Sequence, residues 1–119
     1  MTPYVCTLSD IPPSASEARA ALGDFLDEQD WRSASGRMDA LLAVSELVAD
    51  AQQHSAGIGQ LSARTFQYTL ELTLDYLPGA RTAPRSGLGW SIVNAVARGV
   101  TLTESRDAGC RARVLMDLA

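Results

Sequence analysis

The chain has 119 residues, which is enough to bury one hydrophobic core but too few for two, so we expect a single domain over residues 1–119. The net charge of −4, with no cluster of basic residues, argues against a nucleic-acid-binding surface. All ten basic residues are arginine, which excludes a P-loop lysine and Schiff-base chemistry.

The two cysteines, Cys6 and Cys110, are far apart and have no metal-ligand spacing, so we expect free thiols in a reducing compartment. The N-terminus lacks the charged and apolar regions of a signal peptide, and no apolar run approaches the ~18 residues of a membrane span. These features predict a cytoplasmic protein without a membrane segment.

The first part of the chain predicts a strand and a helix. Residues 4–8 alternate as in a short strand, and two prolines follow. Ser14 and Glu17 have the spacing of a capping box, which predicts a helix over residues 15–29. Residues 31–36 are polar and predict a connector.

A second helix is predicted over residues 37–54. Its apolar positions keep the spacing of one helical face, which should lie against a core: Leu41, Val44, Leu47, Val48 and Ala51. Glu46, Asp50 and His54 form a second stripe at intervals of four residues. Such a stripe is typical of a ligand site, but also of a solvated helix face that ends in a histidine cap.

Strict alternation over residues 66–75 predicts a strand with one face on the core. Residues 60–65 are either a separate partner strand or the start of the same strand, since a hairpin turn here would lack Gly and Asn. Pro78 and Gly79 end the strand, and residues 80–85 form a short basic loop.

The last part of the chain predicts a helix and a hairpin. The helix covers residues 89–98 and is closed by Gly99. Two strands follow, over residues 100–104 and 112–118, joined by a turn.

The order of the elements predicts an α+β fold, a two-layer sandwich with helices on one face of a mixed, mostly antiparallel sheet. The predicted core residues come from the helices and strands alike: Leu41, Val48, Leu70, Leu72, Val93 and Val114.

Three features have the chemistry of an ATP site. Gly87 and Gly89 let the backbone approach a ligand at a helix N-terminus, which favours phosphate. Asp75, at a strand end, can accept a hydrogen bond from an exocyclic amine, and an acidic side chain such as Asp50 can hold Mg²⁺ near phosphates. A G-x-G before a helix is also typical of tight packing, and an aspartate such as Asp75 of a turn cap.

The order of these features resembles that of the histidine-kinase-like (GHKL) ATPases, in the version of the actinobacterial anti-sigma-factor serine kinases. Residues 43–54, AVSELVADAQQH, look like the N-box. Residues 74–79, LDYLPG, resemble the first glycine box, and residues 87–93, GLGWSIV, resemble the second. The resemblance extends over nearly the whole chain from Ile11.

The resemblance implies a Bergerat-type site for ATP and Mg²⁺. By its boxes, Glu46 orients or activates the attacking hydroxyl, Asp50 binds Mg²⁺ and Asp75 holds the adenine amine. The first glycine box supplies a further nucleotide contact, Gly79. The second box contacts the phosphates, with Gly87, Leu88 and Gly89. Such proteins typically form homodimers, bind a sigma factor and phosphorylate a serine of a STAS-domain anti-anti-sigma partner.

The chain departs from the family pattern at three places. Asp50 stands where relatives have asparagine, and Leu77 where many have glycine or another small residue. The loop between the glycine boxes is short, and Arg81 and Arg85 could compensate for it as phosphate donors. Two hypotheses follow: an ATP-binding anti-sigma-type serine kinase, or a noncatalytic protein-interaction module that keeps the fold and has lost nucleotide binding.

Overall fold

The computed structural model describes residues 5–8, 14–29, 34–54, 58–77, 88–105 and 109–117. In chain order its elements are β1 (Val5–Leu8), α1 (Ala15–Asp27), α2 (Ala34–His54), β2 (Ile58–Phe66), β3 (Thr69–Tyr76), α3 (Leu88–Val96), β4 (Gly99–Ser105) and β5 (Gly109–Asp117).

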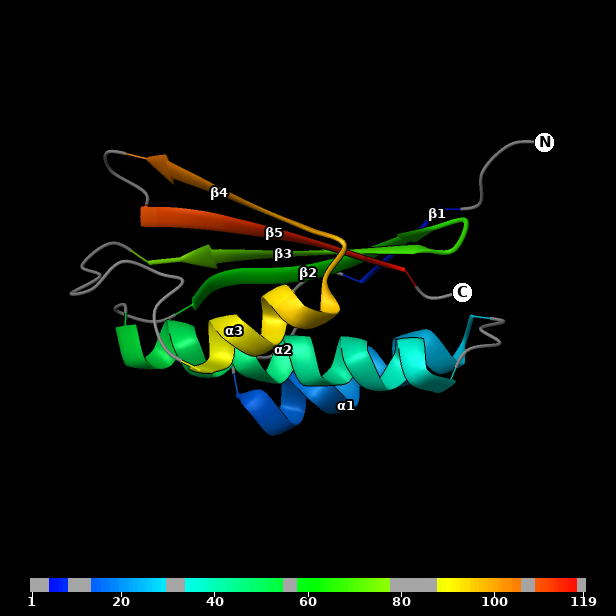
Figure 1. Cartoon of the computed structure of the whole chain (residues 1–119). Helices are drawn as coiled ribbons and strands as arrows, with labels where there is room; N and C mark the ends of the chain where they lie inside the picture. Colours follow the sequence, from blue (N-terminus) through cyan, green and yellow to red (C-terminus); the bar gives the residue numbers. More distant parts are fainter. Residues whose placement is uncertain are drawn as a thin grey trace.

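The strands form one five-stranded sheet in the order β1-β2-β3-β5-β4. Figure 1 shows the three helices on one side of this sheet, with α2 along its length. The predicted α+β, two-layer architecture is therefore confirmed. The sheet was expected to be mixed, but each of the four described strand pairs is antiparallel.

The two long helices begin and end close to their predicted bounds. The Ser14 Oγ accepts a hydrogen bond from the Glu17 N–H at 3.2 Å, so the N-terminus of α1 is capped as the sequence predicts. The predicted end at residue 29 is too late, since α1 stops at Asp27. The second helix begins earlier than predicted, at Ala34, because part of the polar connector is helical.

The core lies between the helices and the sheet. Alternate residues of β3 are fully buried, from Leu70 to Tyr76. Five of the six predicted core residues are at most 1% exposed: Val48, Leu70, Leu72, Val93 and Val114. Leu41 is only partly buried, because it lies at the contact between α2 and Gly23 of α1 rather than under the sheet.

The prediction of one strand over residues 66–75 is wrong. Two residues, Gln67 and Tyr68, form a tight turn between β2 and β3, which pair antiparallel from Ile58 opposite Tyr76 to Phe66 opposite Thr69. Gln67 takes the left-handed conformation that glycine or asparagine usually supplies, with φ 53°. Residues 60–65 therefore belong to a separate partner strand.

The C-terminal hairpin of β4 and β5 is confirmed, with longer strands than predicted. The third helix ends at Val96, two residues before the predicted end, and Gly99 is the first residue of β4 rather than a helix cap. Cys110 is buried. No helix in the described part of the chain is both long and apolar enough to cross a membrane.

Candidate functional site

Asp50 is a buried carboxylate that contacts two aromatic side chains from other elements. It is 6% exposed, and it is the one charged residue buried in the part of the chain that the structure describes. The Tyr76 hydroxyl donates a hydrogen bond to its Oδ2 at 2.7 Å, and the Trp90 Nε1–H donates to the same oxygen at 2.6 Å. We call these three residues the Asp50 cluster.

The fold brings the cluster together from three elements. Tyr76 is the last residue of β3, and it continues the row of buried leucines on the face toward the helices. Trp90 lies in the first turn of α3 and is 1% exposed. Asp50 is on the side of α2 toward the core, between buried Val48 and Ala51. The cluster therefore connects the long helix to one strand end and one helix start.

The chemistry of the cluster is that of an internal hydrogen-bond acceptor. A buried tyrosine or tryptophan needs a partner for its polar atom, and a carboxylate is a strong acceptor in a water-poor environment. Burial raises the pKa of the Tyr76 phenol, and the hydrogen bond to Asp50 and the negative charge of Asp50 raise it further. The phenol thus keeps its proton and remains a donor.

Glu46 lies one turn before Asp50 on α2 and is half-buried. Within the described part of the chain, its side chain makes no hydrogen bond or ion pair. The structure thus places the two acidic residues of the predicted stripe on one helix with different surroundings, because Asp50 has donors and Glu46 has none there.

Asp75 lies on the opposite face of the sheet from the cluster. Successive residues of a strand point to opposite faces, so Asp75 points away from the helices when Tyr76 points toward them. On that open face the Arg111 Nε donates to Asp75 Oδ1 at 2.6 Å and Nη2 donates to Oδ2 at 3.2 Å. This hydrogen bonding raises the pKa of the Arg111 guanidinium. The structure does not bring Asp75 to Asp50 and Glu46.

The glycine-rich segments are only partly described. Gly79, Arg81, Arg85 and Gly87 lie outside the described residues. Leu88 and Gly89 are the first two residues of α3, so the third helix starts within the segment that resembles the second glycine box. His54 is the last residue of α2.

Oδ2 of Asp50 is not placed to hold a magnesium ion in this arrangement. Mg²⁺ needs carboxylate oxygens that face water or phosphate in near-octahedral geometry. Oδ2 of Asp50 instead accepts two hydrogen bonds from side chains that are at most 1% exposed. Among the residues described, no three His, Cys, Asp or Glu side chains gather where they could hold a metal ion.

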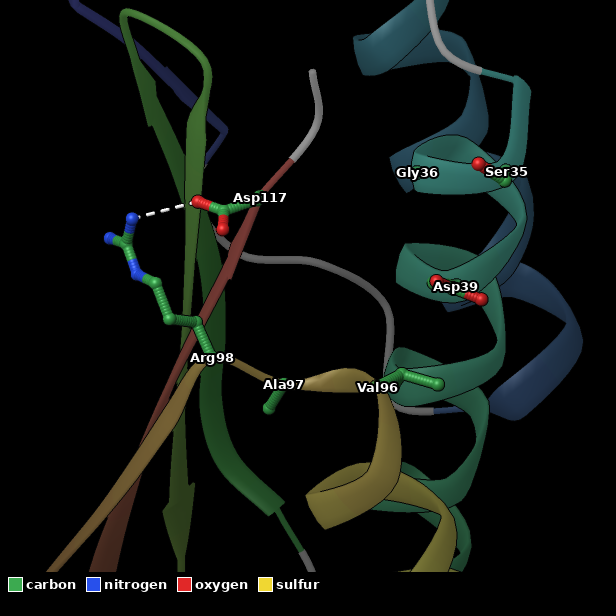
Figure 2. Close-up of a pocket in the computed structure, with 7 residues that line it drawn as sticks. All are labelled: Ser35, Gly36, Asp39, Val96, Ala97, Arg98 and Asp117. Atoms are coloured by element: carbon green, nitrogen blue, oxygen red, sulfur yellow. Dashed lines mark hydrogen bonds and ion pairs between the residues drawn. The ribbon is translucent and has the colours of Figure 1, made fainter.

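A cavity of about 350 Å³ lies at the other end of α2. Figure 2 shows it between the first turns of α2, the end of α3 and the end of β5, with the residues Ser35, Gly36, Asp39, Val96, Ala97, Arg98 and Asp117. At its rim the Arg98 Nη1 donates to Asp117 Oδ1 at 2.7 Å. Asp39 is eleven residues before Asp50, roughly 16 Å along the helix, so this cavity is separate from the Asp50 cluster.

Sequence reasoning missed Tyr76 and Trp90 as partners of Asp50. A signal was present, because the alternation that places Leu72 and Leu74 on the core also places Tyr76 there and Asp75 on the other face.

In comparisons with known proteins, no family model matches the chain and no curated protein matches it.

Proposed function

We propose that this chain is a noncatalytic protein-interaction module with the element order of a GHKL domain, which binds a partner protein and not ATP. The observation that carries the proposal is the pair of hydrogen bonds from Tyr76 and Trp90 to the carboxylate of Asp50. Asp50 is the residue that the resemblance would assign to Mg²⁺, and here its carboxylate accepts hydrogen bonds from two buried side chains.

The energy of these contacts opposes metal binding. If Oδ2 of Asp50 turned from Tyr76 and Trp90 to a magnesium ion, two buried donors would lose their acceptor. A buried polar group without a partner costs roughly 1–3 kcal/mol, so the two together would cost roughly 2–6 kcal/mol. That cost would weaken nucleotide affinity by roughly one and a half to four orders of magnitude.

The outward side of α2 supports the protein-interaction part of the proposal. Met38 is 68% exposed and Leu42, one turn later, is 41% exposed. Ser45 and Ala49 continue the same side and are partly exposed. At Ser45 this side meets α1, where the Arg19 Nη1 donates to Ser45 Oγ at 3.3 Å. The exposed Met38 and Leu42 are apolar, and methionine is enriched in protein interfaces, which lack charged side chains at their centre. By resemblance, the partner is a sigma factor.

The second candidate function is an ATP-binding serine kinase that binds a sigma factor and phosphorylates a STAS-domain partner. The observation that favours it is the half-buried Glu46 without a partner in the described part of the chain, one turn from Asp50 on the helix that resembles the N-box. In this function Asp50 would hold Mg²⁺ either through Oδ1 or after Tyr76 and Trp90 release Oδ2.

Isothermal titration with ATP and Mg²⁺ separates the two functions. We expect no saturable heat at millimolar nucleotide for the wild type or for Asp50→Asn, which removes the extra negative charge. Asp39→Asn is the matched control, since Asp39 is a half-buried acid on the same helix away from the cluster. Saturable, Mg²⁺-dependent binding by the wild type that Asp39→Asn keeps and Asp50→Asn changes would overturn the proposal.

A further inference from the structure

The face of the sheet away from the helices presents three arginines to solvent. Arg64 of β2 and Arg111 and Arg113 of β5 have side chains that are 48%, 55% and 52% exposed. Their acidic neighbours on β3 lie lower, since the side chains of Glu71 and Asp75 are 16% and 27% exposed. Figure 1 shows the three helices on the opposite side of the sheet. On this face the positive groups are therefore nearer to solvent than the negative ones.

The three arginines are not equally well paired. Arg111 holds Asp75 with two hydrogen bonds, the shorter at 2.6 Å. Arg64 Nη2 is 3.4 Å from Glu71 Oε1, and Arg113 Nε is 3.8 Å from Oε2 of the same residue. Both distances exceed the roughly 2.7–2.9 Å of a charge-assisted hydrogen bond. Two guanidinium groups thus share one carboxylate, and their remaining N–H groups have no acceptor in the described part of the chain.

The strand register fixes the positions of these two arginines. Glu71 is directly opposite Arg64, and Arg113 is opposite Thr73, the next residue of β3 on the same face. Arg64 and Arg113 therefore stand on either side of β3, roughly 10 Å apart by the spacing of strands. The Arg64 guanidinium also lies 5.4 Å from the centre of the Phe66 ring, a cation–π contact that holds it over the sheet. A second carboxylate above Glu71 would reach both guanidinium groups.

An apolar side chain adjoins this pair. Leu115 follows Arg113 on the same face of β5 and is half-buried. Its partner on β4 is Gly99, which has no side chain to cover it. We call Arg64, Glu71, Arg113 and Leu115 the arginine patch. It combines one uncompensated positive charge with a partly uncovered apolar group.

We propose that the arginine patch binds an acidic segment of a partner protein, with a carboxylate on Arg64 and Arg113 and an apolar side chain on Leu115. Guanidinium groups bind carboxylates with two parallel hydrogen bonds, and arginine is enriched in protein interfaces. The patch is on the other side of the sheet from the helix layer that carries Met38 and Leu42, so it is a surface beyond the one of the proposed function.

The charges favour a protein segment over a nucleic acid. A nucleic acid is held by several phosphate contacts, each of which needs a basic group. The arginine patch has one uncompensated positive charge, and the whole chain has a net charge of −4. An apolar side chain such as Leu115 has a natural counterpart in a protein segment, but none in a phosphate backbone.

Fluorescence anisotropy with a labelled short peptide rich in glutamate and leucine tests the proposal. We expect saturable binding by the full chain that weakens with added salt, and no binding of the same peptide with glutamine in place of each glutamate. R64Q/R113Q should lower the affinity roughly tenfold or more, because it removes charged donors to the peptide. R19Q/R37Q removes the same charge from α1 and α2 and should leave the affinity unchanged.

Glu71→Gln tests the shared carboxylate itself. It frees Arg64 and Arg113 from their internal acceptor, so the peptide should bind severalfold more tightly than to the wild type. Asp39→Asn changes the net charge by the same amount on α2 and should have no effect. Circular dichroism checks that each variant is folded.

The proposal is overturned if the wild type shows no saturable binding of the acidic peptide at low salt. Equal losses of affinity in R64Q/R113Q and R19Q/R37Q would also overturn it, since binding would then follow net charge alone. So would a single-stranded RNA of equal charge that binds more tightly than the peptide and loses this affinity in R64Q/R113Q. No nucleotide is present in the peptide assays, so this test and the ATP titration of the proposed function fail separately.

Discussion

Replacement of Asp50 by asparagine tests whether this carboxylate stabilises the fold or is kept for a ligand. Asparagine retains an acceptor oxygen but loses the charge, so two charge-assisted hydrogen bonds become neutral ones. Charged hydrogen bonds contribute about 1.5–3 kcal/mol each and neutral ones about 0.5–1.5. We therefore expect Asp50→Asn to lower the free energy of unfolding by about 2–3 kcal/mol.

Alanine at the same position removes the oxygen that accepts both hydrogen bonds. Tyr76 and Trp90 would then be buried without a partner, so the expected loss for Asp50→Ala is about 2–6 kcal/mol. Asp39→Asn, on the same helix, should stay within about ±0.5 kcal/mol, because the half-buried Asp39 side chain makes no hydrogen bond or ion pair in the described part of the chain.

Urea denaturation followed by circular dichroism measures these changes, and an unchanged slope with denaturant confirms that the midpoint shift reports stability. A double-mutant cycle of Asp50→Asn with Trp90→Phe then isolates the coupling between the two side chains. A carboxylate kept only for a ligand tends to destabilise the fold, and its removal stabilises it. A neutral or stabilising Asp50→Asn would refute the reasoning.

Three further outcomes are expected. Leu72→Ala should cost about 2–5 kcal/mol in urea denaturation, because the side chain is fully buried. Burial raises the pKa of the Tyr76 phenol above the usual value of 10.0, so above pH 10.0 the unfolded state loses this proton while the native state keeps it. The contribution of this group to the free energy of unfolding is therefore complete below pH 10.0 and declines above it. The fall in unfolding free energy above that pH should therefore be smaller in Tyr76→Phe than in the wild type, whereas Tyr68→Phe, at an exposed turn residue, should leave it unchanged. Asp75→Asn should change the free energy of unfolding by less than about 1 kcal/mol, since its ion pair with Arg111 is on the open face; a larger loss would show that the pair is more than a surface contact.

The layers of the fold follow from local patterns in the sequence. Periodicity located α2 and the alternation of β3, and the Ser14 cap located the start of α1. The β2–β3 turn was not predictable from turn residues, because Gln67 adopts a left-handed conformation without help from glycine or asparagine. Its position depends on the pairing of β2 with β3 along eight residue pairs, which is a tertiary effect.

The candidate site was less predictable than the fold. The motif reasoning placed Asp50 and Asp75 in one site because both are acidic and close to expected boxes. Successive residues of a strand point to opposite faces of the sheet, so Tyr76 lies beside Asp50 and the preceding residue, Asp75, lies on the other face. The hydrogen bond from Trp90 depends on how α3 packs on α2, which no local pattern specifies.

The most direct test of the account observes the Trp90 indole N–H by two-dimensional NMR in the full-length protein. The central claim is that this group stays bonded to Asp50 whether or not nucleotide is present. Trp31 is the other tryptophan, and Trp31→Phe assigns the signals. The account predicts a Trp90 signal that is protected from solvent exchange and does not move with millimolar ATP and Mg²⁺. A saturable shift of that signal, with loss of protection, would contradict it.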